Sequence, residues 1–273
     1  MRLTVLADNQ AARNLHAEWG FSIFIEADHQ RVLFDVGASN LFLTNAALLK
    51  IDLLKIDCLV LSHGHWDHTW GLDGLLKLYL TAGPSFEKRP KLVAHPLALL
   101  PKFRNNGTEF GSLIHESVLT RNFQTALSKE PLWLTENLVF LGEIERKIEP
   151  EQAMGETVSS GALTPDYLWD DTALAYKLPQ GLVVITGCSH SGICNIVRQA
   201  QTVCREERIV DIIGGFHLLN PDPGRLQETV TFLKNLSPAQ LHPCHCTDLN
   251  SKIALRQAAI TKEVSSGLQL NYD

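Results

Sequence analysis

The residues most able to do chemistry lie between positions 62 and 72, in the segment SHGHWDHTWGL. Three histidines and an aspartate, His63, His65, Asp67 and His68, fall within six positions. Imidazole suits Zn, Fe, Ni or Cu, and a carboxylate broadens the choice. His63 and His65 can point the same way from an extended backbone. The spacing therefore predicts a site for one or two metal ions, in which Asp67 orients a water or accepts its proton.

The alternative for this segment is a set of solvated loop histidines. Four ligand-type residues in six positions, directly after the apolar strand CLVL, argue against it. Three further apolar runs also end in a histidine: GLVVITGCSHSG at His190, IVDIIGGFHLL at His217 and AQLHPCHCTD at His245. Strand ends that converge from distant parts of a chain are a common way to build a site. We therefore expect these histidines to lie near the first cluster.

Small polar residues at two expected helix starts favour a phosphorylated ligand. Ser189, Ser191 and Gly192 open one expected helix, where free N–H groups favour an anion. Thr247 stands at the start of another. Ordinary capping by Ser and Thr is the alternative, and for Thr247 it explains the sequence at least as well.

Basic and aromatic residues could complete such a pocket. Lys102, Arg104 and Arg121 could reach over the site from an irregular region. Trp66 and Trp70 flank the histidines and could line a pocket for a flat ring. Packing against the following helix is the alternative, and we prefer it for Trp70.

Short apolar segments alternate with amphipathic ones, which is typical of a layered α/β fold. Segments rich in Val, Ile, Leu or Phe and bounded by turn residues are expected to be strands: 3–8, 21–27, 31–36, 58–62, 91–94, 173–178, 181–186, 209–213 and 239–242. Helices are expected over about 39–50, 70–80, 192–205, 223–235 and 248–260. The first three strands are expected to form an antiparallel meander, with a hairpin turn at EADHQR.

We expect a single domain over residues 1–273, long enough to bury a sizeable core. No internal repeat and no clean linker is visible. The interval from about 101 to 170 has poor periodicity and many Gly, Asn and Ser residues, so it is predicted to be an irregular loop or cap insertion. A functional loop and plain surface decoration both fit this composition.

Composition argues against several classes of partner. The chain of 273 residues is 45% hydrophobic with a net charge of −6, and it has no basic stripe for a nucleic acid. No window approaches the ~20 apolar residues that span a membrane, and MRLTVLADNQ does not resemble a signal peptide. We expect a cytoplasmic protein that acts on a small molecule, with the oligomeric state open. The six cysteines are expected to be reduced thiols.

The segment SHGHWDHTWGL resembles the signature of the metallo-β-lactamase superfamily. ADN, WGFSIFIE and VLFDVG precede it, and GCSHSGICN, GGFHL and HCT follow it. This order is similar to that in the dihydropterin–ribofuranosylaminobenzene phosphate synthase group, and the segments extend from Asp8 to Thr247. The resemblance implies an α/β fold, a four-layered αββα sandwich of the metallo-β-lactamase type. It also implies one or two metal ions at the sheet edge, Zn²⁺ first, with Fe or Mn as alternatives.

The residue-by-residue match supplies most of the site. It implies these metal ligands: His63, His65, Asp67, His68 and His245. Asp35 in FDVG matches a carboxylate that usually supports the ligands from behind.

The chain departs from the superfamily pattern at two positions. Between His68 and His190 no histidine lies in an HTxG-like turn, so His190 is expected to be the next ligand. The usual GD dipeptide reads GC, which leaves the bridging ligand open among Cys188, His217 and Asp171. Cys188 could instead be a buried thiol, and His217 could bind substrate or cap a helix.

A metal-dependent hydrolase of an ester or phosphoester-type substrate, including a phosphorylated one, is the first functional expectation, because bound Zn²⁺ lowers the pKa of its water to about 7. The resemblance implies an alternative, a transferase that joins a pterin pyrophosphate to ribofuranosylaminobenzene phosphate and releases pyrophosphate. A non-catalytic metal-binding protein is a third class, against which the intact first motif argues. β-Lactamase activity is not expected because those enzymes are normally exported, and a nuclease is disfavoured by the acidic charge.

Overall fold

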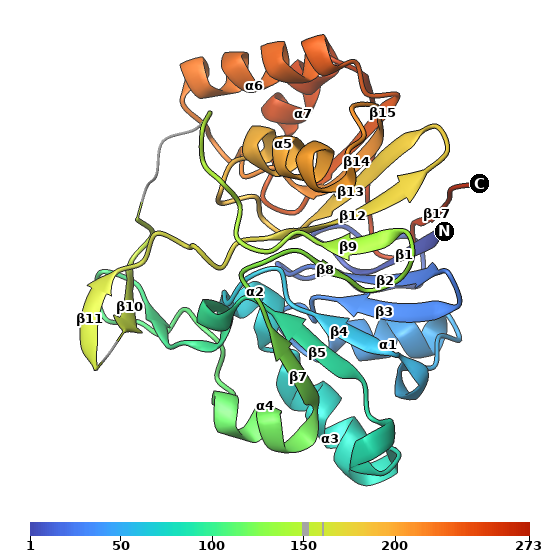
Figure 1. The fold of residues 1–273 in the computed structure, drawn as a ribbon, viewed down its shortest axis with the longest axis vertical. Helices are drawn as coiled ribbons and strands as arrows, with labels where there is room; N and C mark the ends of the chain where they lie inside the picture. Colours follow the sequence, from blue (N-terminus) through green and yellow to red (C-terminus); the bar gives the residue numbers. More distant parts are fainter. Residues whose placement is uncertain (149–152, 160) are drawn as a thin grey trace. The chain divides into compact units, whose positions relative to one another are not determined.

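The computed structural model describes residues 1–148, 153–159 and 161–273. Its contacts divide the chain into two compact units. The N-terminal unit comprises Met1–Lys129, Gln152–Asp170 and Ser265–Asp273, and the C-terminal unit comprises Glu130–Glu151 and Asp171–Val264. Each unit contains its own seven-stranded sheet (Figure 1). The single domain expected over residues 1–273 stays a prediction.

The sheet of the N-terminal unit has the order β17-β1-β2-β3-β4-β5-β7. The antiparallel meander predicted for the first three strands is confirmed, with Asp28 and His29 at positive φ in its hairpin turn. From β3 to β7 the strands run parallel, so their carboxyl ends share one edge. The strands are β1 (Arg2–Ala7), β2 (Ser22–Ala27), β3 (Gln30–Phe34), β4 (Cys58–Val60), β5 (Lys91–Ala94), β7 (Gln124–Leu127) and β17 (Gln269–Asn271).

Helices of the N-terminal unit cover one face of this sheet. Phe42, Leu75 and Tyr79 from two of them share a buried core with Leu33 and Leu59 from the strands. The helix predicted over 70–80 is preceded by a separate short helix that carries part of the histidine segment. The helices are α1 (Leu41–Leu48), α2 (Trp66–Thr69), α3 (Leu72–Ala82) and α4 (Glu116–Asn122), with 3-10 turns at Leu53–Lys55, Phe86–Lys88 and Pro96–Leu99.

The sheet of the C-terminal unit has the order β16-β15-β14-β13-β12-β9-β8. Strands β13 to β16 run parallel and β8 to β13 antiparallel. Predicted strands 173–178 and 181–186 are confirmed residue for residue. The strands are β8 (Leu132–Trp133), β9 (Leu138–Phe140), β12 (Ala173–Leu178), β13 (Gly181–Thr186), β14 (Ile209–Gly215), β15 (Gln240–Cys244) and β16 (Ile260–Thr261).

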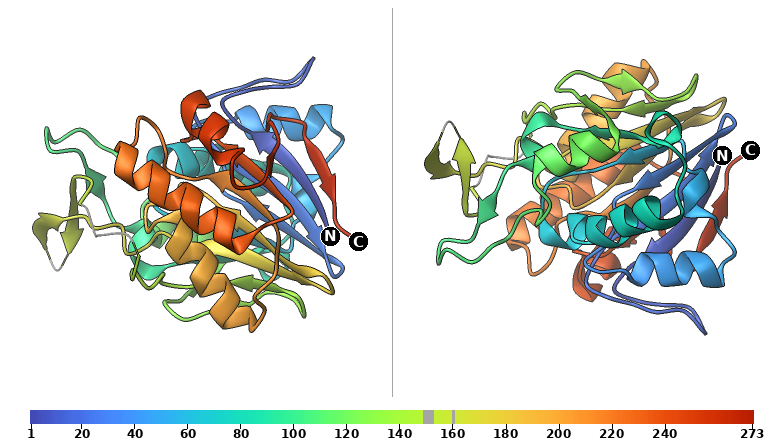
Figure 2. Two further views of the ribbon diagram at one scale, coloured as in Figure 1. Left: turned by 90° about the horizontal axis from the view of Figure 1, so that it is seen from above. Right: turned by 90° about the horizontal axis from the view of Figure 1, so that it is seen from below.

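Three helices, α5 (Ile193–Cys204), α6 (Pro223–Leu236) and α7 (Leu249–Leu255), lie over one face of this second sheet (Figures 1 and 2). Ile196 and Val197 of α5 and Leu233 of α6 pack in one buried cluster with Val184 and Ile212 of the strands. Each unit therefore supplies one helical layer and one sheet layer.

The interval 101–170 contains more regular structure than the sequence indicated. It holds α4, β7, β8 and β9, together with a three-stranded sheet of order β11-β10-β6. The strands of that sheet are β6 (Lys102–Phe103), β10 (Glu156–Ser159) and β11 (Ala162–Pro165). Strands of two to four residues are too short to show an alternating pattern in sequence. Residues 149–152 and 160 of this interval lie outside the described residues.

All six cysteines are reduced thiols, and all are buried. In the parts of the chain that the structure describes, no helix is both long and apolar enough to cross a membrane.

Candidate functional site

The histidine segment begins where the buried strand β4 ends. His65 has an extended backbone (φ −72°, ψ 155°) and caps α2, so the chain turns into the helix immediately after it. The rings of His63 and His65 have centroids 4.6 Å apart, and those of His63 and His68 lie 4.3 Å apart. Ligand nitrogens of His63 and His65 lie within 4.8 Å of each other. The structure thus gathers all three imidazoles on one turn of the N-terminal unit.

Asp35 lies behind these imidazoles at the carboxyl end of β3. Its Oδ1 accepts a hydrogen bond from the Ser62 amide (2.7 Å), and its Oδ2 accepts one from the Ser62 hydroxyl (2.6 Å). The same Oδ2 lies 2.7 Å from Nδ1 of His68. A carboxylate at Nδ1 fixes the tautomer of the imidazole and leaves Nε2 as the nitrogen that could bind a metal. The backbone of Asp35 is left-handed (φ 58°), a conformation that is uncommon outside glycine and concentrates at functional sites.

Asp67 is held in place by a residue that sequence reasoning missed. The indole Nε1 of Trp19 donates to Oδ2 of Asp67 at 3.0 Å, and Oδ1 of Asp67 lies 3.9 Å from Nε2 of His68. The Phe21 amide also donates to the main-chain oxygen of Asp67. One carboxylate oxygen is therefore oriented by Trp19 while the other faces an imidazole. The only signal in the sequence was the position of Trp19 directly before an apolar strand.

The ammonium group of Lys102, which could have reached over the histidines, is bonded to two carboxylates instead. The group is buried and bonds to Asp166 (2.7 Å) and Asp170 (2.9 Å). Burial alone would lower the pKa of Lys102, but the two carboxylates outweigh burial and raise it. Asp170 also accepts a hydrogen bond from the Gly64 amide at 2.8 Å. Gly64 lies within residues 63–68, the histidine turn.

Arg104 remains a cation near the histidine turn. Its guanidinium lies 4.5 Å from the centroid of the Phe110 ring, and that ring lies 4.2 Å from the ring of His65. Arg104 is exposed, as is Arg121 on α4. The Trp70 indole donates to the Gly111 carbonyl. Its packing against the helix stays a prediction.

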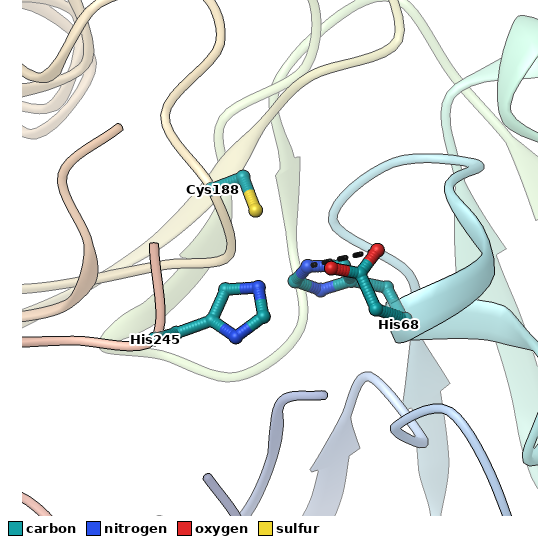
Figure 3. Close-up of side chains that lie close together, drawn as sticks. His68, Cys188 and His245 are labelled. Carbon is teal, nitrogen blue, oxygen red and sulfur yellow. Dashed lines mark ion pairs between the residues drawn. The ribbon is translucent and has the colours of Figure 1, made fainter. Parts of the chain in front are cut away.

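In the C-terminal unit, three adjacent parallel strands end in left-handed residues. Ser189 (φ 58°), His217 (φ 52°) and His245 (φ 51°) follow β13, β14 and β15. Figure 3 shows the side chains of Cys188 and His245, and their ligand atoms lie within 4.8 Å of each other. The rings of His190 and His217 have centroids 4.3 Å apart. One edge of this sheet therefore carries four of the residues predicted from the sequence: Cys188, His190, His217 and His245.

Cys246 is a further thiol of this edge that the sequence did not single out. Burial opposes its ionisation, but hydrogen bonds with Cys188 and His217 and the nearby His245 lower its pKa well below the ordinary 9.0. Its sulfur would lie only 2.5 Å from a Cβ atom at Gly215. Glycine is therefore required at position 215, where β14 ends.

The start of α5 is not an open anion site, which corrects the expectation for Ser189 and Ser191. The carboxylate of Asp171 already accepts hydrogen bonds from the amide (2.8 Å) and hydroxyl (2.5 Å) of Ser191. Burial raises the pKa of Asp171 to about 6 despite these bonds. The Ser189 hydroxyl donates to the Gly215 carbonyl. The polar groups expected to bind a phosphate are thus used within the protein.

Thr247 likewise has a structural role. Its hydroxyl accepts a hydrogen bond from the Phe216 amide at 3.0 Å. The N-cap of α7 is Asp248, which accepts from the Ser251 amide. An anion site at Thr247 is therefore not indicated.

Comparisons with known proteins bear on these two sets of residues. The sequence model described as metallo-β-lactamase superfamily matches residues 20–90, which include Asp35 and the histidine turn. A 7,8-dihydropterin-6-methyl-4-(β-D-ribofuranosyl)-aminobenzene-5'-phosphate synthase from Methanocaldococcus jannaschii is 30% identical over 264 residues, covering 92% of this chain and 89% of that protein. An uncharacterised protein of the same organism is 30% identical over 255 residues, covering 93% and 94%.

A solved structure extends the similarity to three dimensions. The crystal structure of Tm1679, described as a metal-dependent hydrolase of the β-lactamase superfamily, has a TM-score of 0.86 and 28% identity. The match covers 100% of this chain and 99% of that chain, which confirms the predicted fold class. The chain has the histidine turn, two helix-covered β-sheets and relatives that are similar over nearly their whole length. It belongs to the metallo-β-lactamase superfamily of enzymes.

Proposed function

We propose that this protein is a metal-dependent hydrolase of an ester or phosphoester-type substrate. The observation that carries the proposal is the histidine turn, where three imidazoles and the Asp67 carboxylate converge and Asp35 fixes the tautomer of His68. Imidazole nitrogen and carboxylate oxygen form a donor set suited to Zn²⁺, with Fe or Mn as alternatives. The residues therefore fit a bound metal.

The proposed ligands come from both units. The N-terminal unit supplies His63, His65, Asp67 and His68, and the C-terminal unit supplies His190 and His245. Cys188 is the proposed bridging ligand.

The contacts inside the C-terminal unit favour Cys188 over the other two candidates. Among the described residues, neither Asp171 nor His217 belongs to a group of three or more ligand atoms within 4.8 Å of one another, whereas Cys188 belongs to one that includes His245. The Cys188 sulfur lies beside a ring nitrogen of His245, and thiolate is a strong ligand for zinc. His217 then remains for contact with substrate.

Asp67 is the proposed catalytic residue. When bound, Zn²⁺ lowers the pKa of a water to about 7 and polarises a substrate oxygen. The Trp19 hydrogen bond holds one oxygen of Asp67, which leaves the carboxylate oriented to align the attacking water and accept its proton.

A transferase is the second candidate, and the synthase relative from Methanocaldococcus jannaschii favours it. In that reaction an aromatic amine replaces water as the nucleophile. The amine nitrogen bonds to the pterin methylene carbon and releases a proton, while the carbon–oxygen bond breaks and pyrophosphate leaves with its electron pair. The same ligands would stabilise that leaving group. The two candidates thus differ in the acceptor rather than in the site.

Assays with two acceptors separate the candidates. Purified protein of known metal content is incubated with a phosphodiester, a thioester and a pterin pyrophosphate, the last with and without ribofuranosylaminobenzene phosphate. Metal-dependent turnover without the amine supports the hydrolase. Pyrophosphate release that requires the amine supports the transferase. Metal-loaded protein inert in every assay would contradict both.

Arg104 is the proposed contact for a phosphorylated substrate, because it is exposed and its guanidinium stacks on Phe110 beside His65. Arg104→Gln should raise KM for a phosphorylated substrate about tenfold, equal to about 1.4 kcal/mol. Arg121→Gln changes an exposed arginine on α4 and serves as the control. Equal effects of the two substitutions would contradict the assignment.

A further inference from the structure

We propose that Asp170 is a positioning residue for the His63–His65 pair, that it acts through the amide of Gly64, and that buried Lys102 fixes Asp170 for this task. The inference rests on the proposed metal-binding function. All of these residues belong to the N-terminal unit.

The contact between Asp170 and Gly64 controls the backbone between the two histidines. Gly64 lies between His63 and His65, and its N–H donates to Oδ2 of Asp170 at 2.8 Å. That N–H belongs to the rigid peptide unit that also carries the carbonyl of His63. Fixing its direction therefore fixes the dihedral angles on both sides of the peptide, and with them the directions of the two imidazoles.

Lys102 leaves Asp170 little freedom to rotate. Oδ1 of Asp170 accepts from the Lys102 ammonium at 2.9 Å, so both oxygens of this fully buried carboxylate are engaged. The stem of Lys102 also packs against the turn, because a Cβ atom at Gly64 would lie 2.7 Å from its Cε and 2.3 Å from the Ala98 carbonyl oxygen. One buried side chain thus contacts the turn directly and through Asp170.

Asp166 provides a matched control within the same cluster. It is also buried, its Oδ2 accepts from Lys102 at 2.7 Å, and its Oδ1 accepts from the Leu168 amide at 2.9 Å. Asp166 and Asp170 therefore share the same cation and each binds one main-chain amide. They differ in whether that amide lies between the two histidines. A role limited to stabilising the fold would make the two carboxylates equivalent.

The test compares Asp170→Ala with Asp166→Ala in the full chain. Zinc affinity is measured by competition with a chromophoric chelator, and folding is followed by circular dichroism in urea. We expect Asp170→Ala to raise the dissociation constant for zinc about 10- to 100-fold, the usual effect of losing a group that orients a ligand. Asp166→Ala should lose a comparable amount of urea resistance while keeping near wild-type zinc affinity.

Asp170→Asn and Asp166→Asn keep the test decisive where alanine prevents folding. In Asp170→Asn the single amide oxygen could accept from Gly64 or from Lys102 but not from both. Asp170→Asn is therefore still expected to weaken zinc binding more than Asp166→Asn does, by a smaller factor than between the alanine variants. Equal zinc affinities for the two substitutions, or wild-type affinity in Asp170→Ala, would overturn the inference. Wild-type protein that binds no zinc would instead refute the proposed function, and this inference with it.

Discussion

Replacing Asp35 by asparagine is the perturbation whose consequence the structure specifies in most detail. Asparagine keeps the side-chain volume and tolerates the left-handed backbone at this position (φ 58°) better than most residues. The substitution therefore changes hydrogen bonding with little strain. The carboxylate accepts three hydrogen bonds, two from Ser62 and one from His68, all at 2.6 to 2.7 Å.

An amide cannot satisfy all three donors. Its oxygen can still accept from the Ser62 amide, and its NH₂ group can donate to the Ser62 hydroxyl, which rotates. The same NH₂ group then faces Nδ1–H of His68 and cannot accept from it. His68 must move, or shift its proton from Nδ1 to Nε2, the atom assigned to the metal. A hydrogen bond to a charged group contributes about 1.5–3 kcal/mol. Because the lost bond holds the tautomer of His68 that leaves Nε2 for the metal, metal binding should weaken by a similar amount.

We expect Asp35→Asn to weaken zinc binding about 10- to 100-fold, which corresponds to about 1.4–2.7 kcal/mol. Zinc competition measures the affinity, and nitrogen-15 NMR of the imidazoles reports the tautomer of His68. Ser62→Ala is the control for the His68 tautomer, because it removes a hydroxyl bonded to the same carboxylate but leaves the His68 contact intact. That hydroxyl also lies 2.9 Å from Nδ1 of His63, so the zinc affinity of Ser62→Ala reports on His63 as well. Wild-type affinity together with an unchanged tautomer in Asp35→Asn would refute the reasoning.

Three other substitutions test separate features. Trp19→Phe removes the bond that orients Asp67 and should lower kcat/KM about tenfold, or about 1.4 kcal/mol, without changing the melting temperature; kinetics equal to wild type would contradict this role. Burial raises the pKa of Asp171 from 3.8 to about 6, so the folded protein keeps a proton that the unfolded chain releases. In metal-free protein, the unfolding free energy of wild type should therefore fall relative to that of Asp171→Asn as the pH rises from about 3.8 to about 6, by at most about 3 kcal/mol. Urea titrations that show a pH-independent difference between the two proteins would contradict this. Gly215→Ala places a methyl group 2.5 Å from the Cys246 sulfur and should cost about 1–3 kcal/mol of stability; an unchanged thermal transition would show that the sheet edge relaxes.

The sequence predicted the long elements and the histidines at the strand ends because these follow local patterns. Strands such as 91–94 and 181–186 are continuous apolar runs bounded by turn residues, and the structure matches them residue for residue. The histidines at 63, 65 and 68 could be assigned because their spacing alone brings them onto one turn.

The rest depended on contacts between residues far apart in the chain. Lys102 bonds to Asp166 and Asp170, which lie 64 and 68 positions away, so its burial could not be read from its surroundings in sequence. Trp19 and Asp67 are separated by 48 positions. The serines before α5 favoured an anion site, but Asp171 accepts the hydrogen bonds of Ser191 and the Gly215 carbonyl accepts that of Ser189. Local polarity therefore identified candidates, but not which of them were already bonded within the fold.

Metal content measured by mass spectrometry is the most direct test of the central claim, which is that histidines from both units bind metal. Wild type, His65→Ala and His245→Ala are purified from zinc-supplemented medium, so that one ligand from each unit is removed in turn. The account predicts one or two bound ions in wild type and a clear loss in both folded variants. Metal-free wild type, or a full metal complement in either variant, would contradict it.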